Sequence, residues 1–137
     1  MRVMLDTNVL LSALLFPGQK FDSLLENVFS FHELVISNFL LDELRKVVKK
    51  KFSTKTEALE RFISAISFEF VIIPEKFKQV VPIRDPNDYP VLLSAFTGNI
   101  DVLVTGDKDF MDLNLARPEI LTPAAYIEKY VAKQSED

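Results

Sequence analysis

The 137-residue sequence contains no cysteine, no tryptophan, a single histidine and only three glycines. The absence of cysteine excludes disulfides, thiolate metal sites and cysteine nucleophiles. With His32 as the only imidazole, zinc chemistry has few ligands to use. The chemistry of this chain must therefore rest on oxygen and amine side chains.

Long apolar runs are also missing. No stretch approaches the ~18 residues of a membrane span, and the amino terminus leads straight into a strand-like segment without a secretion signal. The length suits one domain with a sizeable core, and 48% hydrophobic residues with a net charge of −4 are typical of a soluble folded protein. We therefore expect a cytoplasmic protein that needs no structural metal to fold.

Strand-like and helix-like segments alternate along the chain. This order predicts a single α/β domain over residues 1–134, in three α/β/α layers around a mostly parallel, Rossmann-like sheet, with residues 135–137 as a frayed tail. The segment Glu75 to Pro82 is left open between a loop and a short helix, and Gly98 is predicted to end a helix in the left-handed conformation. The expected strands are 2–5, 33–36, 68–73, 102–105 and 119–121, and the expected helices are 7–16, the segment around 21–29, 38–50, 53–66, 91–97 and 123–132.

Two apolar strands run directly into aspartates. Asp6 follows Val3-Met4-Leu5, and Asp107 follows Val102-Leu103-Val104-Thr105-Gly106. Ligands and metals bind at the carboxyl edge of parallel sheets, and a carboxylate close to the core is costly unless it is hydrogen-bonded or bound to a cation. Capping of the next helix is the alternative for each residue, and we favour a functional site for hard cations.

A third acid, Glu43, lies in the helix after the second strand. Spacing around the helix places it beside the buried stripe, whereas Asp42 points to the polar side. Glu43 can therefore reach over the sheet edge. A surface ion pair with Lys46 or Lys50 is an equally good explanation of Glu43 alone.

The fourth acid, Asp88, precedes Pro90 near the start of a helix. Considered alone, Asp88 is best explained as a helix cap. Asp85, just before Pro86, is interpreted as a turn former. Asp109 is a candidate outer ligand or a ligand of a second metal.

These segments together resemble the PIN domain. The resemblance rests on Leu5-Asp6-Thr7-Asn8-Val9, Ile36-Ser37 with Glu43-Leu44, Arg84-Asp85-Pro86 with Asp88 and Leu92-Leu93-Ser94-Ala95, and Val104-Thr105-Gly106-Asp107-Lys108-Asp109-Phe110. The resemblance covers essentially the whole chain. Within the superfamily, the segments Arg84-Asp85-Pro86 and Val104-Thr105-Gly106-Asp107-Lys108-Asp109 are similar to those of the toxin branch of toxin–antitoxin systems. Each motif alone is weak, but four in this order are specific.

The resemblance implies an endoribonuclease that uses Mg²⁺ or Mn²⁺. It implies a single-stranded RNA substrate, an antitoxin protein and a homodimer as partners, and it leaves open RNA processing or decay without an antitoxin. The implied catalytic and metal-binding residues are Asp6, Glu43, Asp88 and Asp107, with Asp109 as a further ligand, and the implied substrate-binding residues are Asn8, Ser37, Arg84, Thr105 and Lys108.

Basic residues follow Glu43 in the sequence. They form either an ordinary solvated helix end or a binding surface for RNA, and they are Lys46, Lys49, Lys50, Lys51 and Lys55. A binding surface for RNA predicts that the affinity for RNA falls steeply with salt. Most phenylalanines occupy apolar-stripe positions. Phe16, beside Pro17-Gly18, is the expected exposed exception.

Two rival classes remain open. A haloacid-dehalogenase-like phosphatase also begins with an apolar strand and an aspartate, but it needs a second aspartate where this chain has Asn8. In a non-catalytic binding module, the acids would only cap helices and apolar surface would dock a partner. Phe21, Leu24, Leu25 and Phe29 would supply such a surface, although an ordinary core also accounts for them.

Overall fold

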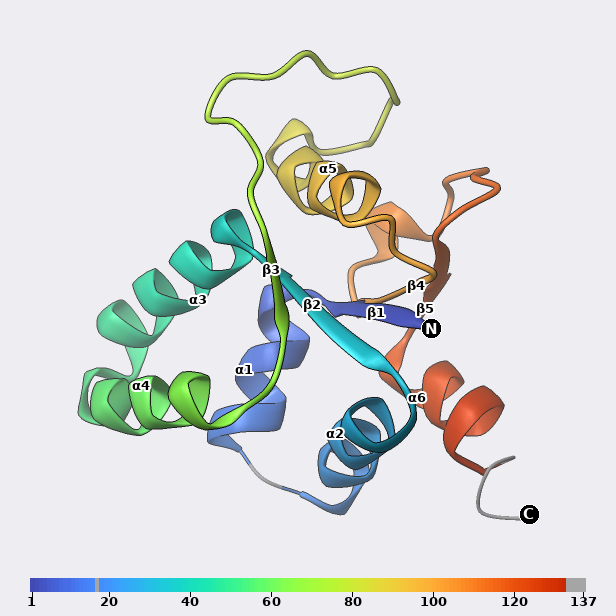
Figure 1. The fold of residues 1–137 in the computed structure, drawn as a ribbon. Helices are drawn as coiled ribbons and strands as arrows, with labels where there is room; N and C mark the ends of the chain where they lie inside the picture. Colours follow the sequence, from blue (N-terminus) through green and yellow to red (C-terminus); the bar gives the residue numbers. More distant parts are fainter. Residues whose placement is uncertain (17, 133–137) are drawn as a thin grey trace.

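A computed structural model describes residues 1–16 and 18–132. Five strands form one parallel sheet in the order β3-β2-β1-β4-β5, flanked by helices (Figure 1). The strands are β1 (Arg2–Leu5), β2 (Glu33–Ser37), β3 (Glu69–Val71), β4 (Val102–Val104) and β5 (Glu119–Leu121). The predicted α/β class and parallel sheet are confirmed. None of the helices described is long and apolar enough to cross a membrane.

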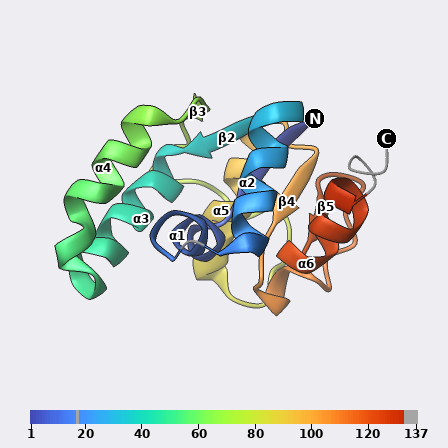
Figure 2. The same cartoon turned by 90° about the horizontal axis from the view of Figure 1, so that it is seen from below.

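The helices cover the two faces of the sheet unequally. Figures 1 and 2 show α5 on one side of the sheet, and α1, α2 and α6 on the other. The α-helices are α1 (Thr7–Leu15), α2 (Gln19–Phe31), α3 (Asn38–Lys51), α4 (Thr56–Ala65), α5 (Tyr89–Thr97) and α6 (Pro123–Tyr126). Short 3₁₀ helices are η1 (Ser53–Lys55), η2 (Pro86–Asp88) and η3 (Lys108–Phe110), and a π-helical turn covers Ile127–Val131.

The strand order determines where a site can form. The chain moves outward from β1 through β2 to β3, and then crosses through α5 to β4 on the opposite side of β1. The order therefore reverses between β1 and β4, and the crevice outside the carboxyl ends of these strands is where open α/β sheets bind ligands. Asp6 and Thr105 follow the two strands, and the Asp6 amide donates to the Val104 carbonyl across them at 3.1 Å.

The core lies around these central strands. Val3, Met4, Leu103 and Val104 are fully buried, which agrees with continuous apolar runs on a sheet covered on both faces. Burial of such side chains stabilises the fold by roughly 1.5–3 kcal/mol each.

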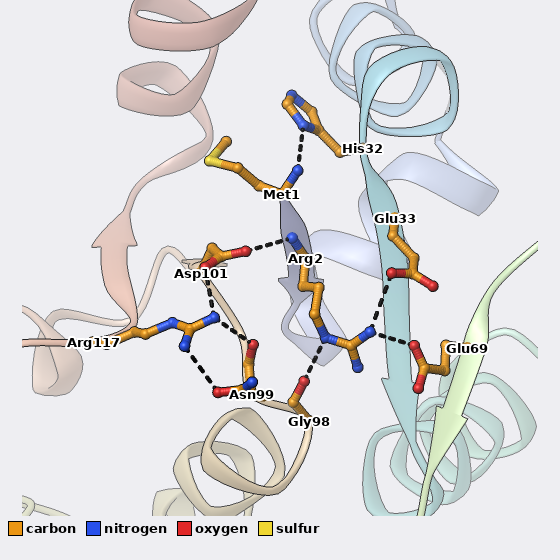
Figure 3. A network of polar contacts seen from close by, with 9 residues as sticks. All are labelled: Met1, Arg2, His32, Glu33, Glu69, Gly98, Asn99, Asp101 and Arg117. Atoms are coloured by element: carbon orange, nitrogen blue, oxygen red, sulfur yellow. Dashed lines mark hydrogen bonds and ion pairs between the residues drawn. The ribbon is translucent and has the colours of Figure 1, made fainter.

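The amino edge of the sheet is held by a polar network centred on Arg2 (Figure 3). The Arg2 side chain donates to the Gly98 carbonyl at 2.7 Å and pairs with Glu33 at 3.1 Å and with Glu69. Its backbone amide donates to Asp101 at 2.8 Å. The network therefore ties β1 to β2 and β3 on one side and to the start of β4 on the other.

Several expected details differ in the structure. The third strand is shorter than predicted, covering Glu69–Val71, and residues 75–82 form a loop rather than a helix. This loop is held to α5 by Tyr89, whose hydroxyl accepts from the Val80 amide at 3.2 Å. The predicted tail, residues 135–137, lies outside the described residues.

The prediction that a helix ends at Gly98 is confirmed, since α5 ends at Thr97, but the expected left-handed conformation of Gly98 is wrong. Gly98 has a φ of −79°, and Asn99 adopts the positive φ of 54°. Asparagine tolerates this conformation better than most residues. A Cβ on Gly98 would lie 3.2 Å from Ser94 O, from Val35 Cγ1 and from Ile100 Cδ1. Close packing, and not backbone conformation, favours glycine here.

Candidate active site

Asp6 lies at the junction of β1 and α1 and is almost completely buried. Its Oδ1 accepts from the Val9 amide at 2.9 Å, so it caps α1, and its Oδ2 accepts from the Thr105 hydroxyl. Burial raises the pKa of Asp6, as does the charge of Asp107, whereas the two hydrogen bonds lower it. The sequence treated capping and a functional site as alternatives for Asp6. In the structure, Asp6 caps α1 and also interacts with the charge of Asp107.

Thr105 connects the ends of β1 and β4. Its hydroxyl donates to Asp6 and accepts from the Asp107 amide at 3.0 Å. Asp107 then accepts from the Asp109 amide at 2.9 Å through Oδ1. A continuous chain of hydrogen bonds thus fixes the two strand-end aspartates relative to each other.

Burial and neighbouring carboxylates both act on Asp88. Burial raises its pKa to about 6, and the charges of Asp107, Asp85 and Asp109 act in the same direction. Its side chain makes no capping hydrogen bond to α5, so capping does not explain Asp88. The residue that caps is Asp85, whose Oδ1 accepts from the Asn87 amide at 3.0 Å.

One group of three carboxylates in the described part of the chain has the spacing of a metal site. Oxygen atoms of Asp85, Asp88 and Asp109 all lie within 4.8 Å of one another, and the three residues are half-buried. Asp88 and Asp109 were expected, but Asp85 was not. Asp85 approaches Asp88 because it directly precedes η2, and side chains three residues apart eclipse each other in a 3₁₀ helix.

Arg84 lies at the outer side of this group. It pairs with Asp109 at 3.6 Å and with Asp112 at 3.0 Å, and its side chain is 69% exposed. A hollow of about 310 Å³ opens beside Asp109, lined by Pro82, Ile83, Arg84, Asp109, Asp112 and Leu113. Arg84 is therefore placed to meet a ligand that enters next to the acids.

The remaining predicted residues lie in different surroundings. Asn8 and Lys108 are exposed near the acidic edge. Ser37 is fully buried, where its Oγ accepts from the Leu40 amide at 3.1 Å and lies 2.7 Å from the Ser94 Oγ. The hydroxyl groups of Ser37 and Thr105 both form hydrogen bonds inside the protein. Contact of either residue with a substrate stays a prediction.

Glu43 is half-buried on α3 and Asp42 is exposed, as the helical spacing predicts. In the described part of the chain, the Glu43 side chain makes no ion pair with Lys46 or Lys50, and Glu43 does not belong to the group of close carboxylates. The structure therefore brings Asp6, Asp85, Asp88, Asp107 and Asp109 together, and Glu43 stays a predicted member of the site.

The donor set is suited to a hard divalent cation. Carboxylate oxygens are the preferred ligands of Mg²⁺, Mn²⁺ and Ca²⁺, and a cation would offset the repulsion that raises the Asp88 pKa. The arrangement can thus bind a metal ion beside an exposed arginine.

Comparison with known proteins agrees with this geometry. No curated protein sequence matches the chain significantly. The chain is similar to one in the crystal structure of VapBC2 from Rickettsia felis bound to a DNA fragment from their promoter, with 25% identity and a TM-score of 0.66 over 88% of this chain and 97% of that chain. The family model for the PIN domain matches residues 2–109, which include every acid of the cluster. The chain belongs to the PIN domain family.

Proposed function

We propose that this protein is a metal-dependent endoribonuclease and the toxin of a toxin–antitoxin pair. The observation that carries the proposal is the unbalanced acidic cluster at the carboxyl edge of the sheet, where three carboxylates approach within 4.8 Å and Asp88 has a pKa of about 6. PIN domains are generally nucleases, and this cluster lies at the position where such a sheet binds ligands.

Two sets of acids would hold the metal. The short distances between carboxylate oxygens support Asp85, Asp88 and Asp109 as ligands. The family resemblance adds Asp6, Glu43 and Asp107. A bound Mg²⁺ or Mn²⁺ supplies an activated water at neutral pH and stabilises the leaving oxygen of a phosphodiester. No side-chain nucleophile is required.

The surrounding residues have separate tasks in this proposal. Thr105 holds Asp6 and the Asp107 backbone in fixed positions. Arg84 restrains Asp109 and, being exposed, is available to a phosphate of the substrate. Lys108 and Asn8 lie at the exposed rim, where they offer further donors to the RNA backbone.

The phosphatase alternative finds little support in the geometry. Its nucleophile would be Asp6, but both oxygens of Asp6 accept hydrogen bonds and the residue is only 7% exposed. A carboxylate held in this way is poorly placed to attack phosphorus.

The partners follow from the same comparison. The similar chain occurs in a VapBC2 structure, which supports a cognate antitoxin for this chain as well. RNA processing without an antitoxin remains the alternative biology for the same chemistry, and a homodimer belongs to the proposal on grounds of family resemblance.

The test is cleavage of a mixed pool of single-stranded RNA with Mn²⁺ and with a chelator. Wild type should cleave only with the metal, and Asp6→Asn or Asp107→Asn should reduce the rate by more than about a hundredfold, because these residues fix the metal-binding edge. Cleavage that survives both the chelator and the two substitutions would refute the metal-dependent mechanism.

A matched pair of variants on α3 tests the role of Glu43. Glu43→Gln should slow cleavage at least tenfold if the side chain completes the site, whereas Asp42→Asn, a neighbour on the exposed side of the same helix, should leave the rate unchanged. Equal rates for both variants would remove Glu43 from the proposed site.

A further inference from the structure

Positive charge is concentrated in one short part of the chain. Residues 45–55 contain six of the sixteen basic residues and no acid, so the rest of the chain carries ten basic and twenty acidic residues. This segment covers the second half of α3 and η1. We call its five lysines, Lys46, Lys49, Lys50, Lys51 and Lys55, the lysine face.

The lysine face is not neutralised within the molecule. Across residues 1–16 and 18–132, no ion pair includes any of the five lysines. The nearby acids of α4 are engaged elsewhere, since Glu60 pairs with Arg45 at 2.8 Å and Glu57 lies 3.9 Å from Arg61. An ordinary solvated helix end accounts for lysines that complement the helix dipole, but not for the aromatic residues beside them.

An exposed aromatic ring lies at the end of this face. Phe16, which follows α1, is 46% exposed and packs edge-on against Phe52 with 5.1 Å between ring centroids. The Lys55 ammonium lies 5.9 Å from the centroid of the Phe16 ring. Phenylalanine leaves water readily, so a half-exposed ring fixed beside a cation offers a stacking surface for a base.

The helix links this surface to the acidic site. Glu43, Lys46 and Lys50 are spaced so that they share one side of α3. The helix begins at Asn38, directly after Ser37 at the carboxyl end of β2, and its 14 residues extend roughly 20 Å from the sheet edge. A strand of several nucleotides can follow this side of the helix away from the acids.

We propose that the lysine face and the Phe16 ring form a second contact surface for single-stranded RNA, which holds the strand along α3 while another part of it enters the acidic site. The proposal rests on the ribonuclease function proposed above for the choice of ligand. Lysines supply the phosphate contacts, and Phe16 stacks on a base without selecting its identity.

The experiment measures binding without cleavage. A fluorescein-labelled oligouridylate of about 12 nucleotides is titrated with the full chain in chelator, and fluorescence anisotropy is recorded at several salt concentrations. Wild type should bind with a steep salt dependence. Lys46, Lys50 and Lys55 changed together to Gln should weaken binding about tenfold at low salt and flatten the logarithmic salt slope by about 2, at about 0.7 per phosphate contact.

Two further variants distinguish this surface from general attraction. Lys20, Lys76 and Lys78 changed together to Gln remove the same charge from exposed positions elsewhere, and they should weaken binding less than twofold. Phe16→Leu keeps an apolar side chain against Phe52 but loses the ring, and should weaken binding about fivefold without changing the salt slope. Thermal melts of each variant establish that it is folded.

The outcomes separate this proposal from the ribonuclease proposal. Equal losses for the two lysine triples, no effect of Phe16→Leu, or displacement of the RNA by poly-glutamate at equal charge would overturn the RNA surface. Cleavage with Mn²⁺ by a wild type that does not bind RNA in chelator would also overturn it, while leaving the nuclease intact. Lysine-dependent and Phe16-dependent binding without cleavage by any metal would support the surface and refute the nuclease.

Discussion

In the described part of the chain, the carboxylates at the amino edge of the sheet are paired with cations, whereas most of those at the carboxyl edge are not. At the amino edge, each acid has a cation: Glu33 and Glu69 pair with Arg2, and Asp101 accepts from Arg117 at 2.6 Å (Figure 3). At the carboxyl edge, five aspartates lie close to one another, and among the described residues only Asp109 of the five pairs with a cation, Arg84, at 3.6 Å. The same residue types are thus compensated at one end of the strands and left repelling one another at the other.

The pKa values of Asp101 and Asp88, one at each edge, are shifted in opposite directions. Asp101 has a pKa below its usual value, because of hydrogen bonds from the Arg2 amide and from Arg117. Burial and neighbouring carboxylates raise the pKa of Asp88 to about 6. Paired charges stabilise the fold, whereas unpaired charges reduce stability and are retained where a ligand restores the balance. The amino edge is therefore structural, and at the carboxyl edge a cation would restore the balance of charge.

The largest expected effect is the response to metal. Mn²⁺ at a hundred times its dissociation constant should stabilise wild type by about 2.7 kcal/mol, which corresponds to a rise of roughly 8 °C in melting temperature. Asp88→Asn and Asp107→Asn should lose this rise. Asp101→Asn, at the amino edge, should melt lower than wild type and yet keep the full response, measured by thermal unfolding with and without Mn²⁺. An Asp88→Asn variant that keeps the full rise would remove Asp88 from the metal site.

Breaking the amino edge should cost stability without affecting metal binding. Arg2→Ala removes the hydrogen bond to the Gly98 carbonyl and both glutamate pairs, and the expected loss is about 2 kcal/mol in the free energy of unfolding. Arg61→Ala is the control, because its contact with Glu57 spans 3.9 Å at an exposed position and should cost less than about 0.5 kcal/mol. Urea unfolding measures both. Equal losses would contradict a structural role for the Arg2 network.

The strand-end acids could be predicted from the sequence because their signal is local. An apolar strand followed by an aspartate is visible without knowing the fold, and parallel strands bring such positions to one edge. Asp6 and Asp107 were found in this way. Asp85 was missed, because its approach to Asp88 depends on the short 3₁₀ helix η2. The same helix makes Asp85, and not Asp88, the capping residue.

The amino edge could not be predicted from the sequence. Arg2, Glu69, Asp101 and Arg117 are far apart in the chain, and they meet only because β1 lies between β2 and β4. Glu69 is the clearest example, since Arg2 reaches it across the neighbouring strand. Alternation of elements predicts a parallel sheet but not which strands are neighbours, so contacts across strands stay hidden until the order is known.

The smallest expected effect has the opposite sign to the loss of Arg2. Because the pKa of Asp88 is raised to about 6 in the folded protein, the folded state binds the proton more tightly than the unfolded state, in which the pKa has its ordinary value of 3.8. The free energy of unfolding should therefore fall as pH rises from about 4 to about 6 and then level off. Asp88→Asn lacks this titration and should be more stable than metal-free wild type at pH 7.5 by about 1 kcal/mol, after allowance for solvent screening. The difference should vanish below pH 4, and Asp42→Asn, outside the cluster, should show none of it. Urea unfolding in chelator at pH 4 and pH 7.5 provides the check, and a variant less stable than wild type at pH 7.5 would mean that Asp88 is already compensated within the protein, as the acids of the amino edge are.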